Sequence, residues 1–464
     1  MGNLAELDHY LEHLCEVLGN VDRSTGLKDY CRGLMLPIAR KSVEPLAACA
    51  EPLHVAAKHQ SLHHFVAKST WSDTAVMGRV RDWVTPALGL ESGRYWIIDD
   101  TGFPKKGKRS VGVARQYCGQ LGKQDNCQVA VSLSLAGARG SIPIAYQLYL
   151  PKDWADDAVR RRTAGVPGDI GFATKPEIAL AQMRQAVAAG VPAGVVLADA
   201  GYGDETAFRD GITALGMIYA VGIRPATTVW APGSAPLPPK PWSGRGRHPT
   251  LLRREPGHEP VAVKALAVAL PESAWRDVAW REGSNARLSS RFAAVRVRPA
   301  HRDYLRPEMR PEEWLLIEWP QGEAEPVKYF LSTAPLEATL EQLVFVTKMR
   351  WRIERDYQEL KQEFGLSHYE GRGWRGFHHH ATLCIAAYGF LVAQRLSHDG
   401  SKKNRARPET SALPADYVPR GSRTGAAARA GLHSDAALSH RASHRQRAPA
   451  MSLLLWGKVC LMTQ

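Results

Sequence analysis

The pattern of apolar residues between positions 91 and 223 constrains the fold of this chain more than any other feature. Three short runs rich in β-branched and aromatic residues come first, separated by turn-forming residues, and predict successive strands at 95–99, 128–136 and 142–151. Helix and strand patterns then alternate at 176–190, 195–201, 204–216 and 217–223. Three strands followed by this alternation predict a mixed α/β layer rather than a symmetric Rossmann arrangement.

The segments on either side of this layer have other periods and compositions. Residues 1–90 show helix-type spacing, with a helix cap expected at Ser72. A stretch rich in proline, glycine, arginine and tryptophan contains strand-like runs at 291–300 and 313–320 and predicts a β-rich insertion. After it come a strand at 327–333 and helices at 337–364 and 378–396. We therefore expect five parts, divided as 1–90, 91–223, 224–326, 327–398 and 399–464.

The chain is basic, and part of that charge lies in its tail. With 60 Lys and Arg against 46 Asp and Glu, the formal net charge is +14. Residues 400–464 hold 11 basic and 3 acidic residues, a net of +8, so the rest of the chain carries +6. A basic balance favours a polyanionic partner, with nucleic acid first. The tail, 399–464, lacks sustained periodicity, and its composition predicts disorder.

Targeting signals and cysteine usage point to one compartment. No stretch approaches the roughly 18 consecutive apolar residues of a membrane span, and the first residues lack the basic-then-apolar order of a signal peptide. The 7 cysteines are scattered and form no C-x-x-C pair, which argues against a disulfide framework or a zinc site. We expect a reduced cytoplasmic protein that does not bind membranes.

Two aspartates end apolar strands in the predicted α/β layer. Asp99 follows the apolar residues YWII, and Asp199 follows VVLA. A carboxylate at the end of a buried strand is costly unless it is paired or bound to a metal. A helix cap or a loop carboxylate is the alternative for each of them. Two such positions in one layer favour a functional site more strongly than a single position does.

A third acid, Glu354, lies in the helix predicted over 337–364. At 100° per residue, Thr347, Arg350, Glu354 and Lys361 fall within an arc of about 60°, beside the apolar positions of this helix. We therefore expect Arg350, Glu354 and Lys361 on the buried face, and Asp356 on the solvated face. An Arg350–Glu354 pair that only supports the helix is the alternative.

Three acids converging in a basic protein suggest a metal site for phosphodiester chemistry. Carboxylate oxygens are the ligands that Mg²⁺ prefers, and two ions can clamp the attacking and the leaving oxygen. His378–His380 compete as metal ligands, but they lack the i,i+4 spacing of a zinc protease helix. We interpret these histidines as surface residues or as residues that face DNA.

These segments together resemble a known family. Arg350, Glu354 and Lys361, in RWRIERDYQELK, resemble the Y-x2-R-x3-E-x6-K signature of bacterial insertion-sequence transposases, the DDE enzymes of the insertion-sequence-four superfamily. IIDDTGFPKKG resembles their first-aspartate segment, VVLADAGYGD their second, and KYFLST the strand before the glutamate helix. Within this superfamily, the sequences of these segments are most similar to those of the seven-hundred-and-one group. The resemblance covers roughly residues 50–397, with threonine at 347 in place of the signature tyrosine.

The resemblance implies a fold and a set of site residues. The family fold is RNase H-like and would bring Asp99, Asp199 and Glu354 together on two Mg²⁺ ions, for which Mn²⁺ can substitute. Asp99 is preferred because it precedes Thr101 by two residues, and Asp100 remains the alternative first aspartate. The implied DNA-binding residues are Arg350, Lys361, Thr347, Lys105, Lys106, Lys108 and Arg109.

The function implied by the resemblance is cut-and-paste DNA transposition. Such an enzyme cleaves and joins transposon ends, with inverted-repeat ends and target DNA as partners, and acts as a homodimer on DNA at the bacterial nucleoid. Two alternatives remain, an RNase H-like nuclease without strand transfer and a catalytically defective DNA-binding remnant. Trp275, Trp280, Trp314 and Trp319 of the insertion could stack on a flipped base, although core packing is favoured for each.

Overall fold

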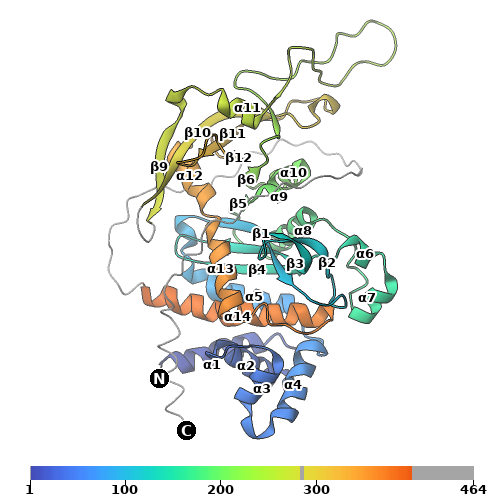
Figure 1. The fold of residues 1–464 in the computed structure, drawn as a ribbon, viewed down its shortest axis with the longest axis vertical. Helices are drawn as coiled ribbons and strands as arrows, with labels where there is room; N and C mark the ends of the chain where they lie inside the picture. The colour runs from blue at the N-terminus through green and yellow to red at the C-terminus, as the bar shows by residue number, and fades with distance from the viewer. Residues whose placement is uncertain (1, 283–286, 400–464) are drawn as a thin grey trace.

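The computed structural model describes residues 2–282 and 287–399, and the predicted tail therefore falls almost wholly outside the described residues. The described part is a mixed α/β protein, as the sequence predicts. Its N-terminal helices, a large sheet and a long helix between them make up most of the molecule (Figure 1). Apolar side chains from these elements pack into one large continuous core.

The first 90 residues are helical, which confirms the prediction for this part. Ser72 caps α5 as predicted, because its hydroxyl accepts a hydrogen bond from the Ala75 amide at 3.1 Å. The helices are α1 (Gly2–Cys15), α2 (Asp22–Met35), α3 (Val43–Ala50), α4 (Val55–Ala67) and α5 (Asp73–Val84), with short 3-10 turns at Pro52–His54, Thr85–Ala87 and Leu90–Ser92.

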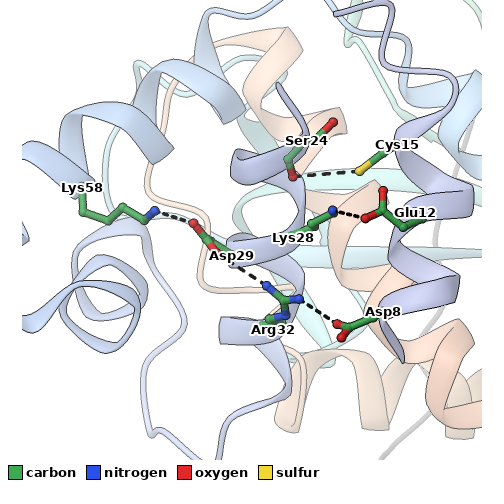
Figure 2. A network of polar contacts seen from close by, with 8 residues as sticks. All are labelled: Asp8, Glu12, Cys15, Ser24, Lys28, Asp29, Arg32 and Lys58. Atoms are coloured by element: carbon green, nitrogen blue, oxygen red, sulfur yellow. Dashed lines mark hydrogen bonds and ion pairs between the residues drawn. The ribbon is translucent and has the colours of Figure 1, made fainter. Parts of the chain in front are cut away.

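Ion pairs link α1, α2 and α4 on the outer side of this helical region (Figure 2). Arg32 of α2 lies 2.7 Å from Asp8 of α1, and Lys28 pairs with Glu12 one turn further along. Asp29 accepts from Lys58 of α4. Partly exposed pairs of this kind contribute about 0–1 kcal/mol each, so the register of these helices depends mainly on their buried leucines and tyrosines.

The predicted α/β layer forms the first half of the sheet. β1 pairs antiparallel with β3 and parallel with β5, and β5 pairs parallel with β6. Along β3, the other partners are β2 and β4. The strands are β1 (Tyr95–Pro104), β2 (Ala114–Cys118), β3 (Lys123–Ala136), β4 (Ser141–Leu148), β5 (Val195–Ala198) and β6 (Tyr219–Ile223). Each strand predicted between 95 and 223 is present.

The β-rich segment extends the same sheet. β12 pairs antiparallel with β6 on one side and with β11 on the other. The described residues thus form a 12-stranded sheet in the order β2-β3-β1-β5-β6-β12-β11-β10-β7-β8, with β4 beside β3 and β9 beside β10. The additional strands are β7 (Thr228–Trp230), β8 (Val261–Ala262), β9 (Arg276–Glu282), β10 (Arg287–Pro299), β11 (Glu313–Trp319) and β12 (Lys328–Ser332).

Tryptophans of this segment pack within it, as the core-packing interpretation predicts. Trp275 and Trp319 make an edge contact with ring centroids 5.2 Å apart, and Trp280 contacts Phe292 at 5.7 Å. The Trp314 indole N–H donates to the Pro335 carbonyl at 2.9 Å. The packing of their rings against other side chains, and the hydrogen bond of Trp314, indicate that these tryptophans serve the fold.

Two short helices stand where one long helix is predicted. α12 (Leu340–Lys348) begins at a capping box formed by Thr339 and Gln342 and ends before Arg350. α13 (Trp351–Gln362) then starts in a new direction (Figure 1). The remaining helices are α6 (Lys152–Ala155), α7 (Ala158–Ala164), α8 (Lys175–Ala188), α9 (Ala200–Gly203), α10 (Thr206–Ala214), α11 (Val263–Val268) and α14 (Trp374–Asp399), with 3-10 turns at Glu272–Ala274 and Asp303–Leu305.

Helix α14 holds the N-terminal helices and the sheet together. It contacts α2, α4, α5 and β4, and in Figure 1 it runs between the sheet and the group of α1 to α4. A helix covered on several sides is expected to be apolar around its circumference, and most of its residues between Phe377 and Phe390 are buried. Within the part of the chain that the structure describes, no helix has the length and apolarity needed to cross a membrane.

The prediction that His378–His380 are surface or DNA-facing residues is wrong. All three are buried, at 6%, 2% and 1% exposure. His378 accepts from the Leu148 amide of β4 at 3.1 Å, and His379 stacks on Trp71 with ring centroids 3.6 Å apart. His380 bonds to the Tyr30 hydroxyl of α2 at 2.9 Å. Three consecutive residues of a helix point in three directions, so the triplet fastens α14 to three neighbours at once.

Replacement of a buried histidine provides a test of this role. In the His378→Ala variant the Leu148 amide loses its acceptor, which should lower the free energy of unfolding by about 1–3 kcal/mol. Urea denaturation of the full chain measures this loss. The His63→Ala variant removes an exposed histidine of α4 and should change stability by less than about 0.5 kcal/mol. If His378→Ala is as stable as wild type but binds DNA more weakly, the result would support the interpretation of His378 as a surface or DNA-facing residue.

Candidate active site

The parallel pairing of β1 and β5 brings two acids together. Tyr95, Trp96 and Ile97 lie opposite Val195, Val196 and Leu197. Continued by two residues, this register places Asp99 beside Asp199, which directly follows β5, whereas β1 itself continues past Asp99 to Pro104. In open α/β sheets ligands bind outside the carboxyl ends of parallel strands, and Asp199 lies at that end of β5.

The backbone around Asp199 is closely packed, with one carboxylate oxygen already used. Asp199 Oδ1 caps the short helix α9 by accepting from the Gly201 amide at 2.9 Å. A Cβ atom at Gly222 of β6 would lie 2.9 Å from the Ala200 nitrogen. Glycine at 222 thus allows β6 to approach the chain directly after Asp199. The helix-cap alternative for Asp199 is therefore correct for one of its two oxygens.

Arg350 connects the two halves of the site. Its Nη1 donates to Asp99 Oδ2 at 2.8 Å, and its Nη2 donates to Glu354 Oε1 at 3.0 Å. Arg350 lies at the junction of α12 and α13, and its guanidinium reaches Asp99 within β1. The two arms of one planar fork thereby hold carboxylates that are 255 positions apart in sequence numbering, at 99 and 354.

The prediction of a buried face carrying Glu354 is wrong. The Glu354 side chain is 62% exposed, whereas Asp356, predicted to be solvated, is 3% exposed and accepts from the Tyr388 hydroxyl at 2.8 Å. The arc of 60° assumes one continuous helix over 337–364. Because the helix breaks between 348 and 351, residues on the two sides of the break do not share one face.

The alternative first aspartate, Asp100, faces another set of partners. Its Oδ2 lies 2.8 Å from Lys175 Nζ of α8 and accepts from the Tyr202 hydroxyl at 3.4 Å. Successive residues of a strand point to opposite faces, so Asp99 and Asp100 cannot both point toward Arg350. Sequence analysis missed Lys175, since nothing in its local sequence signals a contact with a strand 75 residues earlier.

Two of the predicted DNA-binding lysines already hold carbonyl oxygens of the protein. Lys361 Nζ of α13 donates to the Gly102 carbonyl of β1 at 2.9 Å, and burial lowers its pKa to about 8. Lys105 Nζ donates to the Tyr369 carbonyl at 2.9 Å, and burial lowers its pKa as well. Both lysines are therefore fixed close to the end of β1.

The other predicted DNA-binding residues separate into exposed and buried groups. Lys106, Lys108 and Arg109 are exposed on the segment that follows β1. Thr347 is buried at 8% exposure, and its hydroxyl donates to the Leu343 carbonyl one turn earlier at 2.7 Å. The structure thus brings Asp99, Asp199, Arg350, Glu354 and Lys361 to one edge of the sheet and leaves Thr347 inside α12.

The electrostatic environment of Asp99 is unfavourable to its charge. Burial raises the pKa of this carboxyl to about 7, the Arg350 guanidinium opposes that shift, and the nearby Asp199 and Asp100 add to it. Among the described residues, no group of three or more His, Cys, Asp or Glu is arranged closely enough to hold a metal ion as it stands. Arg350 is the cation that lies between Asp99 and Glu354.

The raised pKa of Asp99 predicts a pH dependence of stability in metal-free protein. A protonated Asp99 favours the folded state below its ordinary pKa of 3.8, and this contribution is lost as the pH rises through about 7. Asp99→Asn cannot ionise at this position, so it lacks this loss of stability. Between pH 3.8 and about 7, the free energy of unfolding of Asp99→Asn minus that of wild type should therefore increase by up to about 1.4 kcal/mol per pH unit. Urea titrations in a chelator measure the difference. A difference in unfolding free energy between the two proteins that does not change with pH would contradict the raised pKa of Asp99.

The chain is similar to known proteins over parts of its length. Residues 13–287 match a family model described as DDE superfamily endonuclease, a stretch that includes Asp99 and Asp199 and ends before Glu354. A 168-residue stretch is 34% identical to the "Probable transposase for insertion sequence element IS701" of Microchaete diplosiphon. This alignment covers 36% of the chain and 40% of that relative's length.

The two similarities agree with each other and with the family resemblance seen in the sequence. The family model spans more than half of the chain, and the relative belongs to the same seven-hundred-and-one group that the motifs around Asp99, Asp199 and Glu354 indicate. The resemblance predicted from the sequence is thereby confirmed, and the chain belongs to the DDE superfamily endonucleases.

Proposed function

We propose that this protein is a cut-and-paste DNA transposase that cleaves and joins the ends of an insertion sequence. The observation that carries the proposal is the placement of Asp99 and Asp199 on adjacent parallel strands, with Glu354 linked to Asp99 through Arg350. Its substrates are double-stranded inverted-repeat ends and target DNA, and it acts as a homodimer on DNA in the bacterial cytoplasm, at the nucleoid. The similarity to an insertion-sequence transposase supports this choice of substrate.

We further propose that the strands from β1 to β6 form an RNase H-like core. The order β4-β3-β1-β5-β6, antiparallel on one side of β1 and parallel on the other, supports this assignment. Within such a core the first aspartate would lie in β1 and the second would directly follow β5, as Asp99 and Asp199 do. The glutamate follows on a later helix, here α13, which contacts β1.

The proposed catalytic carboxylates are Asp99, Asp199 and Glu354, and Asp100 remains the alternative to Asp99. They offer the hard oxygen donors that Mg²⁺ prefers, and the repulsion between Asp99 and Asp199 supports the proposal that a cation binds between them. The donor set therefore fits two Mg²⁺ ions, with Mn²⁺ as a substitute. Such ions, once bound, would activate the attacking oxygen and stabilise the leaving 3′-oxygen of the phosphodiester.

The basic residues around the acids would hold the DNA backbone. Arg350 has a planar fork that matches a phosphate, so a phosphate could replace one of the carboxylates that it contacts. Lys361 would present a point charge from the next turns of α13, beside the Gly102 carbonyl. Lys105, Lys106, Lys108 and Arg109 would extend this phosphate track away from the end of β1.

Neutralising the acids tests the assignment. Asp199→Asn and Glu354→Gln should each lower Mg²⁺-dependent cleavage of end DNA by at least about 100-fold, because an uncharged amide is a poor ligand for a hard cation. Affinity for DNA should remain close to wild type, since it depends on lysine and arginine. Parallel Asp99→Asn and Asp100→Asn variants identify the first aspartate.

The outcome also separates transposition from simpler chemistry. A gel assay with pre-cleaved ends and a target duplex reports joining independently of the first cut. Normal cleavage by both Asp199→Asn and Glu354→Gln would refute the three-acid site. If wild type cleaves DNA but never joins it, the protein is an endonuclease rather than a transposase. If it binds DNA without cleaving it, the protein is a DNA-binding remnant.

The roles of Arg350 and Lys361 predict a second set of results. Lys361→Ala should lower cleavage and reduce the salt dependence of DNA binding by about one unit of slope, as expected when one phosphate contact is lost. Arg350→Lys keeps a charge but loses the fork, so it should bind DNA nearly as well and cleave less. Full cleavage per folded molecule, with only a lower melting temperature, would show that both residues are structural.

A further inference from the structure

A long irregular excursion leaves the sheet between β7 and β8. It runs over residues 231–260 and extends beyond the body of the molecule in Figure 1, above and to the side of α11. Loops longer than about 12–15 residues without their own secondary structure are uncommon in compact domains and are usually either functional or linker segments. Neither the carboxylates nor the phosphate track proposed above involves this segment.

The two legs of the excursion are tied to each other and to the protein. Leu237 and Arg253 exchange backbone hydrogen bonds of 2.9 and 3.0 Å. Arg254 forms an ion pair of 2.6 Å with the buried Asp303, and the Leu252 amide donates to the Arg306 carbonyl at 2.9 Å. Prolines at 236, 238, 239 and 241 stiffen the outgoing leg. The legs therefore present a defined tip, residues 240–250.

The tip ends in a Ser-Gly-Arg-Gly-Arg turn beside an exposed tryptophan. Gly244 and Gly246 adopt φ values of +82° and +76°, which only glycine takes up readily. The Trp242 side chain is 50% exposed, and its indole N–H donates to the Gly246 carbonyl at 3.2 Å. The indole also stacks on His248, with ring centroids 6.0 Å apart. The turn is thus held by its own aromatic residue rather than by the rest of the protein.

The charge of residues 231–254, which include the tip, is of one sign. Residues 231–254 contain no acidic residue and five basic ones. Arg254 is neutralised by Asp303, and Arg253 pairs with Glu255. The side chains of Arg245 and Arg247 are exposed and have no ion-pair or hydrogen-bond partner within residues 2–282 and 287–399. Two free guanidinium groups therefore flank a single glycine at the end of a stiff support.

We propose that residues 240–250 form an arm that inserts Arg245 and Arg247 into the minor groove of A·T-rich DNA. The minor groove of such DNA is narrow, and its enhanced negative potential attracts arginine. Gly246 has no side chain, so the backbone between the two arginines can approach the floor of the groove. Guanine would obstruct that approach with its N2 amino group, which A·T pairs lack. The exposed edge of Trp242 can pack against the sugars.

The stiff support favours this partner over a flexible basic loop. Because the prolines and the Leu237–Arg253 pairing order the legs before binding, little chain entropy remains to be lost on contact with DNA. The inference rests on the proposed function for its choice of DNA as partner. It does not depend on the carboxylates or on metal ions, since the arm is a separate element of the surface.

Binding to three duplexes of equal length tests the arm. Fluorescence anisotropy with the full chain, in a chelator that prevents cleavage, compares an A·T-rich duplex, a G·C-rich duplex and the same G·C sequence with inosine in place of guanine. Inosine lacks the N2 amino group of guanine in the minor groove but presents the same hydrogen-bond acceptors in the major groove. We expect wild type to bind the A·T and inosine duplexes about 10-fold more tightly than the G·C duplex.

Matched variants distinguish groove insertion from general attraction. The Arg245→Ala/Arg247→Ala double variant should bind all three duplexes alike. The Arg162→Ala/Arg184→Ala variant removes two exposed arginines from α7 and α8 and should keep the wild-type ratio. Equal wild-type affinity for the three duplexes, or a ratio that survives in Arg245→Ala/Arg247→Ala, would refute the arm. Unchanged DNA affinity in that variant would refute it too and would point to a protein partner.

A cleavage assay keeps the two proposals apart. If Mg²⁺-dependent cleavage of end DNA occurs but no preference for A·T and inosine duplexes exists, the minor-groove arm is wrong and the transposase assignment stands. If the preference exists and is lost in Arg245→Ala/Arg247→Ala while no cleavage can be measured, the arm is correct and the proposed catalysis fails.

Discussion

The contact of the Arg350 guanidinium with Asp99 and Glu354 is the interaction on which the rest of the candidate site depends. Without a cation, a buried Asp99 next to Asp199 would face uncompensated repulsion, and burial already raises its pKa to about 7. Arg350 supplies that charge from the junction between α12 and α13. The same fork then holds the exposed Glu354 in place. The acids are thus kept together by a residue that a phosphate could compete for.

The placement of Arg350 in turn depends on long-range packing. α13 is held against the core through Ile353, Tyr357 and Leu360, which are buried. Beneath it, α14 uses His378, His379 and His380 to fasten α2, β4 and the segment around Trp71. These contacts fix the sheet relative to the N-terminal helices. Damage to this layer would therefore reach the site by moving α13, although no histidine of α14 belongs to the site.

Much of the fold could be predicted from the sequence, because its strands carry their own signals. The apolar runs before Asp99 and Asp199 predicted both strands, and the register of β1 and β5 agrees. The prediction that Asp99 ends its strand is wrong, because β1 stays paired with β3 as far as Pro104. The helix break near Arg350 could not be predicted, since neither glycine nor proline marks it. The contact of Lys175 with Asp100 and the burial of His378 depend on residues distant in sequence, so local patterns were misleading there.

The positions of the cations divide the proposed work with DNA between two regions. Near the acids, Arg350, Lys361 and Lys105 already hold carboxylates or carbonyl oxygens, so a phosphate must displace an existing contact to reach them. Such exchanges add little net affinity, but they place the phosphate within a fixed geometry. Arg245 and Arg247 are exposed and, within the part of the chain that the structure describes, have no ion pair or side-chain hydrogen bond to break. Affinity should therefore come mainly from the periphery, and the centre should contribute chiefly to positioning the scissile bond.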